Sequence, residues 1–584
     1  MYHDSVLERL SDRQCFGCIA VICAVLYVPS LGNDLVNWDD TMLITANPVV
    51  QNFDVVRGFT TFDPELYIPL TLLTYQIEQL IAGNAAWIYH LSNLLLHSAN
   101  ACLLLLIIGG LTKNRLTGLI AALLFAVHPV NSEAVLWASA RKDLLSAFFF
   151  LLAIHLYMKG NRLSIGAFFL GLLSKVSIVV LPFILLLIDH WEGRVIDARR
   201  IRAHWPYFLL SIVFGSIALF GKTATAWAIP ISKSPLLAAK STVFLLQKIL
   251  LPVGLSPIYS QHTPVVIESP EFFLPLIIVF LAAVLLWIFR KRAPLLVWCA
   301  LWFVIIVSPA YFTFSKNGYV LFASNRYVYL ASVGVCIWVT ATGMALASRN
   351  ALMRAAIVVL GVLIVGASVV LTYRQVWVWN TSETLMQHAL IAGYEHPLVW
   401  NNLGAALRSA GRSEEALEAF LKAAEKGQPQ AHANAGNLYR EVGNEAKALE
   451  LFAAGMDAAR AHGAFGTQDL APHFSVAQFL LSQGRNAEAL KVFEEAAQLG
   501  PHIPSAHVNL GMLLLKNGSV SGAKEHLERA TELDRYSATA WYHLALAHAL
   551  QGSRAQAIDA LEQTLRVDPG YEDAEEQLQK LRGG

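Results

Sequence analysis

The sequence predicts an all-α protein in two parts: a polytopic membrane helix bundle of about eleven spans, followed by a solenoid of helical repeats. Three observations predict this architecture. The 584 residues are 55% hydrophobic and 15% charged, against roughly 25% charged residues in an ordinary soluble domain. Long apolar runs occur only between residue 14 and about residue 373. Beyond them the chain repeats itself. We therefore expect a membrane domain in residues 1–380 and a repeat domain in residues 381–584.

The composition excludes several classes of protein. So apolar a chain is neither a single soluble globule nor a disordered polymer. The formal net charge of +1 provides no overall field to attract a nucleic acid. All six cysteines lie in apolar segments, which indicates neither a disulfide framework nor a zinc ribbon.

The membrane spans follow from the apolar runs, because about 20 apolar residues cross a bilayer as a helix. Residues 163–190 are read as two short spans that turn at Lys175. A single span there would put the cations between Arg194 and Arg202 on the wrong side. The expected spans are 14–31, 88–110, 116–130, 144–158, 163–174, 176–190, 205–221, 271–289, 294–312, 327–347 and 355–373.

Lys and Arg set the expected orientation, because they concentrate in cytoplasmic loops. The cation-rich loops place the N-terminus in the cytoplasm, and an odd number of spans then sends the repeats to the external face. This face is the periplasm if the membrane is a bacterial inner membrane, or the lumen if it is the endoplasmic reticulum. The expected external loops are 32–87, 128–143, 222–270 and 313–326.

The C-terminal part has the helix–turn–helix pattern of tetratricopeptide repeats (TPR). A turn glycine recurs at spacings of 32, 41, 34 and 34, and a small residue follows each glycine five positions later. We expect an insertion near residues 460–471 and a polar capping helix over Glu572–Arg582. Such an array either binds a protein on its concave face or only braces the membrane domain. The turn glycines are Gly411, Gly443, Gly484, Gly518 and Gly552.

Two adjacent acids, Asp39 and Asp40, stand at the start of the first external loop. Carboxylates are costly at a lipid surface unless they have a function. A partly buried Asp can act as general base toward a hydroxyl, and a neighbouring carboxylate raises its proton affinity. The alternative is a turn in which the pair caps a helix that begins near Thr41.

The second external loop and the external cations are further candidates. His128 and Glu133 could bind a divalent metal or orient a substrate, or they belong to an interfacial loop anchored by Trp137. Five cations occupy short external loops, where the orientation rule disfavours them. They indicate an anionic ligand such as a lipid phosphate, unless they merely extend to headgroups. These cations are Arg141, Lys142, Lys175, Lys316 and Arg326.

Seven short motifs, in this order, resemble the transmembrane and TPR-containing O-mannosyltransferases and their bacterial relatives. The likeness covers the membrane part and continues into the repeats. The motifs are Trp38-Asp39-Asp40 with Ala46-Asn47-Pro48, Pro69–Tyr75, Tyr89–His97, His128–Val135, Leu172–Lys175, Leu251–Ser260 and Asn325–Leu330.

The resemblance implies a type C glycosyltransferase that moves a sugar, mannose or another hexose, from a polyprenyl-phosphate carrier at the external face. It maps the family's base onto Asp39, with Asp40 supporting it or holding the acceptor. Arg326, then Lys175 and Arg141, are the expected ligands of the donor phosphate. We expect inverting transfer to Ser or Thr hydroxyls of external proteins, with the acceptor protein bound by the TPR array. The resemblance leaves open whether the enzyme uses a divalent metal as cofactor.

Rival functions are transfer to a lipid or polysaccharide acceptor and a non-catalytic membrane scaffold that works through its repeats. A carrier ranks below both. The membrane half shows no clear internal repeat, and its charges lie in loops.

Overall fold

The computed structural model describes all residues except 1–10, 63–65, 222–229, 262, 317 and 584, and the side chains of Ile231, Lys316 and Glu572 are also outside the description. The chain forms two compact units, Met1–Tyr394 and Glu395–Gly584. The boundary therefore lies after Tyr394 and not after residue 380. The reason is that helix α18 (Ser382–Ile391) packs into the first unit, where it buries Leu385, Met386 and Ala389.

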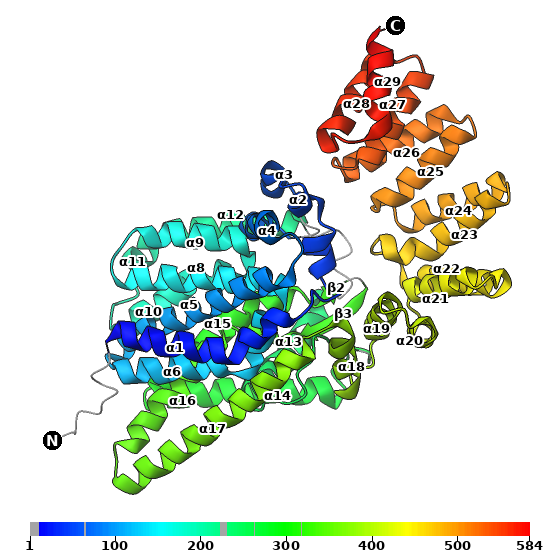
Figure 1. Cartoon of the computed structure of the whole chain (residues 1–584). Helices are drawn as coiled ribbons and strands as arrows, with labels where there is room; N and C mark the ends of the chain where they lie inside the picture. Colours follow the sequence, from blue (N-terminus) through cyan, green and yellow to red (C-terminus); the bar gives the residue numbers. More distant parts are fainter. Residues whose placement is uncertain (1–10, 63–65, 222–229, 262, 317, 584) are drawn as a thin grey trace. The chain divides into compact units, whose positions relative to one another are not determined.

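The first unit is helical, and each of the eleven predicted apolar runs coincides with a helix (Figure 1). The 327–347 run begins later, because Asn325–Val328 forms a separate 3-10 turn before α16. The main helices are α1 (Asp12–Tyr27), α4 (Pro69–Ala82), α5 (Ala86–Thr112), α6 (Arg115–Val127), α8 (Arg141–Met158), α9 (Leu163–Ser174), α10 (Leu181–Trp191), α12 (Trp205–Gly221), α13 (Ser234–Leu250), α14 (Pro270–Phe289), α15 (Pro294–Val307), α16 (Ser332–Ala347) and α17 (Ala351–Val378).

Five helical segments among the described residues are long and apolar enough to cross a membrane by themselves. A sixth candidate is a pair of helices bent by 56°, Arg115–Val127 with Pro129–Leu136. These segments mark the first unit as a membrane domain. The total of eleven spans stays a prediction. The five are Asp12–Gly32, Ala86–Thr112, Pro270–Phe289, Pro294–Phe312 and Ala351–Val378.

The chain reverses direction at Lys175, as predicted. Lys175 is extended between α9 and the 3-10 turn Val176–Val180, and it pairs with Asp143 at the start of α8. At the far end of α10, Asp189 accepts a hydrogen bond from Tyr157 near the end of α8. Helix α9 therefore runs from the end of α8 back toward its start, and α10 runs from the start of α8 toward its end. The two helices point in opposite directions.

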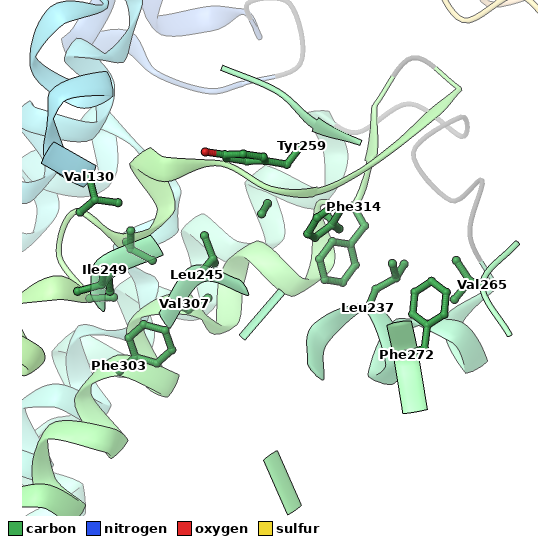
Figure 2. Close-up of a cluster of buried hydrophobic side chains, with 14 residues drawn as sticks. Val130, Leu237, Leu245, Ile249, Tyr259, Val265, Phe272, Phe303, Val307 and Phe314 are labelled. Carbon is green, nitrogen blue, oxygen red and sulfur yellow. The ribbon is translucent and has the colours of Figure 1, made fainter. Parts of the chain in front are cut away.

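A small antiparallel sheet departs from the all-helical prediction. Its strand order is β1-β3-β2, with β1 at Tyr259–Gln261, β2 at Ser315–Lys316 and β3 at Tyr319–Ala323. The sheet covers a buried apolar cluster that includes Val130, Leu245 and Phe303, and Tyr259 belongs to this cluster (Figure 2). The cluster fixes the two loops that precede Asn325 against the segment at Val130.

The short helical elements of the loops also have defined bounds. They include α2 (Pro48–Gln51), α3 (Val55–Thr60), α7 (Ser132–Leu136) and α11 (Ala198–Ala203), with a turn of π-helix at Thr41–Thr45. The 3-10 turns are Val28–Gly32, Pro129–Asn131, Ala138–Ala140, Val176–Val180, Ile231–Lys233, Ser308–Phe312, Asn325–Val328 and Thr467–Leu470.

The second unit is the predicted helical array. Each turn glycine has a positive φ, between 72° and 78°, which residues with a Cβ rarely adopt. Gly404 illustrates the packing: a Cβ there would come within 2.7 Å of the Phe420 ring. The helices are α19 (Pro397–Ser409), α20 (Ser413–Glu425), α21 (Pro429–Glu441), α22 (Glu445–His462), α23 (Ala471–Ser482), α24 (Asn486–Leu499), α25 (Pro504–Lys516), α26 (Val520–Leu533), α27 (Ala538–Leu550), α28 (Arg554–Val567) and α29 (Glu572–Gly583).

Both predicted irregularities of the array are present. The long spacing reflects an extended α22 followed by the 3-10 turn at Thr467–Leu470, and α29 closes the array as a helix rich in charged residues.

Candidate active site

Asp40 is buried in a cage of hydrogen-bond donors. The residue is only 1% exposed. One carboxylate oxygen accepts from the Val36 N–H at 2.9 Å, and the other accepts from the N–H and the hydroxyl of Ser139 at 2.9 and 2.5 Å. Burial raises the pKa of Asp40 to about 6, although these hydrogen bonds lower it. The side chain makes no helix-cap bond, so Asp40 joins the first external loop to the second instead of capping a helix.

Asp39 differs from its neighbour because it is only half-buried. Its backbone carbonyl accepts from the Leu43 N–H at 2.9 Å, so the loop holds its position. Its negative charge raises the pKa of Lys142 and of Arg326, which means that both cations are within electrostatic reach. A half-buried carboxylate thus lies within electrostatic reach of two cations that come from distant parts of the sequence.

The second external loop is not an interfacial loop, because every residue from His128 to Lys142 is buried. Short helical turns provide hydrogen bonds for its buried backbone groups. For example, the Trp137 N–H donates to the Glu133 carbonyl, and the Ala140 N–H donates to the Trp137 carbonyl. Trp137 itself is 0% exposed, so it is not a membrane anchor. The second loop is instead a buried segment that contacts the first external loop through Ser139 and Asp40.

Two cationic side chains lie over the indole ring of Trp137. The Lys142 ammonium lies 5.0 Å and the Arg326 guanidinium carbon 4.9 Å from the ring centre. Lys142 also donates to the Ser139 carbonyl at 2.6 Å. Cations held over an indole are attracted by the electron-rich face of the ring. Burial lowers the pKa of Lys142 to about 8, with Asp39 and Asp143 opposing and Lys175 and Arg326 adding to the decrease.

Glu133 holds Arg326 in place. Its carboxylate accepts from Arg326 Nη1 at 2.9 Å, from the Ser324 hydroxyl at 2.7 Å and from Asn325 Nδ2 at 2.9 Å. The Arg326 side chain is 14% exposed, whereas Glu133 is 2% exposed. The Nε atom of Arg326 is buried and has no hydrogen-bond partner in the described part of the chain. Arg326 is thus the more exposed member of its pair with Glu133.

Lys175 forms an ion pair with Asp143 at 2.5 Å, and both side chains are largely buried. The second carboxylate oxygen of Asp143 is buried without a partner among the described residues. Asp143 and Lys175 both act electrostatically on Lys142. The pair therefore lies near Lys142, and the charge of Lys175 is compensated by Asp143.

Arg141 does not join this cluster. Its guanidinium donates to Glu78 at 2.7 Å, to Asn93 at 2.5 Å and to the Tyr89 carbonyl at 2.7 Å, and the side chain is 1% exposed. These partners compensate its charge and shield it from a ligand. Through these bonds Arg141, at the start of α8, is joined to α4 and α5.

His128 is also committed to the fold. Its two ring nitrogens contact the Ile249 carbonyl at 2.9 Å and the Val130 N–H at 3.2 Å. Over the residues that the structure describes, no three His, Cys, Asp or Glu side chains gather in a group that could hold a metal ion. His128 contacts the chain at Val130 and Ile249, and Glu133 contacts Arg326. The side chain of Lys316 lies outside the described residues.

The sequence marks Lys142 as one of five external cations and Trp137 as a possible interfacial anchor, but it does not predict that Lys142 and Arg326 both lie over the Trp137 ring. A Trp five residues before a Lys in one loop was the available signal, but it does not show that the two side chains meet.

The two units together define a class of protein: a membrane domain followed by tetratricopeptide repeats. Three stretches match models described as "Tetratricopeptide repeat": residues 380–432, 480–544 and 538–571. Proteins named O-mannosyl-transferase TMTC3 match a larger share of the chain, 66–76%.

Protein O-mannosyl-transferase TMTC3 of Mus musculus is 26% identical over an alignment 515 positions long, which covers 76% of this chain and 54% of that protein. The Homo sapiens TMTC3 is 27% identical over an alignment of 448 positions, which covers 66% of this chain and 47% of the human protein. The Homo sapiens TMTC4 is 33% identical over an alignment of 183 positions, which covers 27% of this chain and 24% of that protein. The predicted resemblance to transmembrane and TPR-containing O-mannosyltransferases is confirmed, and the chain spans about half the length of the TMTC3 relatives.

Proposed function

We propose that the protein is an integral-membrane glycosyltransferase that moves mannose or another hexose from a polyprenyl-phosphate carrier to Ser or Thr hydroxyls of external proteins. One observation carries the proposal. The half-buried carboxylate of Asp39 lies within electrostatic reach of Lys142 and Arg326, the two cations that lie over the Trp137 ring. A base next to fixed positive charge suits the transfer of a sugar from a phosphate, and the similarity to proteins named O-mannosyl-transferases supports the same reaction class.

Asp39 acts as the general base. It takes the proton of the acceptor hydroxyl while the hydroxyl oxygen forms a bond to the anomeric carbon. The bond from that carbon to the phosphate oxygen breaks on the opposite face, and its electron pair leaves with the carrier phosphate. The product has inverted configuration at the anomeric carbon. Asp40, whose acceptor positions are occupied by Val36 and Ser139, supports the loop that presents Asp39.

The cations stabilise the leaving group. The carrier changes from a phosphodiester to a phosphomonoester and gains negative charge, so nearby fixed cations lower the barrier. Arg326 is the principal ligand, because it is partly exposed and has an unpaired Nε atom. Lys142 adds a second charge on the same indole. Lys175 acts at longer range through its pair with Asp143.

The topology and the acceptor complete the proposal. The N-terminus lies in the cytoplasm, and the candidate site and the TPR unit lie on the external side, as the distribution of Lys and Arg favours. The TPR array binds the acceptor protein on its concave face, because stacked helical hairpins provide an extended surface for a polypeptide.

The test compares Asp39→Asn with Asp34→Asn. Asp34 is an exposed acid of the same loop, so its variant controls for a change of charge. Membranes that contain each variant are given a polyprenyl-phosphate hexose, and external proteins are analysed by mass spectrometry for hexose on Ser or Thr. We expect Asp39→Asn to lose about 10²–10⁴-fold in rate, the usual cost of a positioned base, while Asp34→Asn keeps activity.

Unchanged turnover in Asp39→Asn removes this residue from the role of base. If Asp39→Asn instead removes a sugar from a lipid or polysaccharide and leaves external proteins unaltered, the acceptor is that lipid or polysaccharide and not a protein. Arg326→Ala is a separate arm, in which KM for the lipid donor should rise more than KM for the acceptor. Equal changes would contradict the phosphate contact.

A further inference from the structure

The segment where α17 ends and α18 begins, residues 376–382, is bonded to the first external loop. Asn33 Nδ2 donates to the Val376 carbonyl at 3.1 Å, and the Asp34 N–H donates to the Asn380 carbonyl at 2.9 Å. The Asn37 N–H, two residues before Asp39, donates to the Ser382 hydroxyl at 2.8 Å. We call residues 376–382 the junction segment. It anchors the loop that carries the proposed base along the part that precedes that base.

The same segment reaches the proposed phosphate site through Trp379. This side chain is 3% exposed and stacks on Trp137, with ring centres 6.0 Å apart and planes inclined by 25°. Trp137 is the ring against which Lys142 and Arg326 lie. One short segment therefore contacts both halves of the proposed centre, the loop of Asp39 and the platform of the cations.

We propose that Trp379 and Ser382 are positioning residues for the transfer reaction: Trp379 fixes the indole that holds the two cations, and Ser382 fixes the loop that holds the base. The proposal rests on the function proposed above. Neither residue touches the reacting atoms. Each acts through a single identified neighbour, so the two halves of the proposal have separate readouts.

The physical role of Trp379 is to keep the cation platform dry and rigid. Lys142 faces Asp39, Asp143, Lys175 and Arg326, and its charge is sensitive to water because the side chain is 4% exposed. Removal of the stacked ring lets water approach Trp137 and hydrate the ammonium. Hydration favours the charged form of an amine. The alkaline limit of activity, where Lys142 loses its proton, should then move to higher pH.

The role of Ser382 is geometric. Its hydroxyl accepts a hydrogen bond from the Asn37 N–H at 2.8 Å. Loss of this acceptor frees the loop next to Asp39 without changing any charge. A small displacement of a base costs rate more than it costs donor binding.

The first experiment compares Trp379→Leu with Trp377→Leu in the full-length protein in membranes. Trp377 lies two residues away, is 57% exposed and contacts Tyr373, so it is a matched control for the loss of an indole near the junction. We expect Trp379→Leu to move the alkaline limit upward by about one pH unit and to raise KM for the polyprenyl-phosphate hexose roughly tenfold. Trp377→Leu should change neither quantity. Trp379→Phe keeps a ring in place and should restore the wild-type alkaline limit.

The second experiment compares Ser382→Ala with Ser382→Thr, which retains a hydroxyl. Ser382→Ala should lower kcat roughly tenfold with KM for the donor unchanged, and Ser382→Thr should recover most of the rate. If Trp379→Leu does not fold, Trp379→Phe and the Ser382 pair still test the proposal. An unchanged alkaline limit in a folded Trp379→Leu overturns the first half, and wild-type kcat in Ser382→Ala overturns the second.

The Asp39→Asn variant separates failure of this inference from failure of the proposed function. Where Asp39→Asn is inactive and the Trp379 and Ser382 variants behave as wild type, the reaction stands and the positioning role falls. Where Asp39→Asn is fully active, the function itself is wrong.

Discussion

Asp40 and Ser139 are 99 residues apart in the sequence and are joined by two hydrogen bonds to a single carboxylate oxygen. The contact fixes the first external loop on the buried second loop. It also separates the roles of two adjacent acids. Asp40 accepts from three donors, whereas Asp39, the proposed base, is half-buried and within electrostatic reach of Lys142 and Arg326.

The first prediction concerns Asp40. In Asp40→Asn, one oxygen becomes an amide that faces a donor, either the Val36 N–H or the Ser139 N–H. A buried donor without an acceptor costs about 1–3 kcal/mol. We expect a lower midpoint in thermal unfolding and faster hydrogen exchange over residues 33–40. Asp39→Asn should leave both measurements near wild type. If Asp40→Asn unfolds like the parent protein, the cage of donors around Asp40 is not important for stability.

The second prediction concerns pH. Lys142, with a pKa of about 8, loses its charge as the pH rises through that value. We expect donor turnover to fall above about pH 8. Lys142→Arg keeps its charge at all accessible pH values and should flatten this decline. Turnover from pH 6 to 10, measured for both proteins, checks the prediction. A decline that persists unchanged in Lys142→Arg would assign it to another group.

Loss of stability does not explain that decline. The pKa of Lys142 is lower in the folded chain than in the unfolded chain, so the folded state binds fewer protons between about pH 8 and pH 10.5. Linkage then requires that this group makes folding more favourable as the pH rises through that window. A thermal unfolding series at the same pH values serves as the control.

The third prediction concerns Glu133. Glu133→Gln removes the charge that compensates Arg326 and puts amide hydrogens against existing donors, including Asn325 Nδ2. Breaking a buried ion pair from one side costs about 3–5 kcal/mol. We expect strongly reduced thermal stability, while Glu192→Gln, at an ion pair elsewhere in the unit, should have a small effect. Equal midpoints for the two variants would contradict the central role of Glu133.

The fourth prediction concerns the repeat unit. Gly404→Ala introduces a methyl group within 2.7 Å of the Phe420 ring, which is 1% exposed and cannot easily move. Overpacking of this kind costs about 1–3 kcal/mol. Phe420→Leu in the same chain should recover part of the loss, because it makes room for the methyl group. Chemical denaturation of the full-length single and double variants measures the coupling. Additive losses would show that the two positions do not meet.

Much of the fold follows from the sequence because hydrophobic periodicity is a local property. The apolar runs give the helices, and the turn glycines give the repeats, since both patterns are set within a few residues. The turn at Lys175 was also predictable, because the distribution of cations disfavours a single span. The sheet at Tyr259 was not, because strands of two to five residues carry no usable period.

The candidate site could be predicted only in part. The sequence places Asp39 and Arg326 in external loops, but it does not show which of two adjacent acids is buried. Arg141 ranked after Arg326 and Lys175 as a phosphate ligand, and the sequence gives no sign of its contact with Glu78 on α4. Trp379 gave no local signal. Its importance depends on a contact with Trp137, more than 240 residues earlier in the chain.

The bonds between the first external loop and the junction segment also constrain the order in which the protein is made. Asn33 emerges from the ribosome early, and its partner Val376 is synthesised 343 residues later. A nascent chain that has not passed Ser382 lacks the anchors of the loop, however many helices have already entered the bilayer. The centre around Asp39 is therefore completed only after translation of the last apolar helix, and a chain truncated within α17 lacks these anchors.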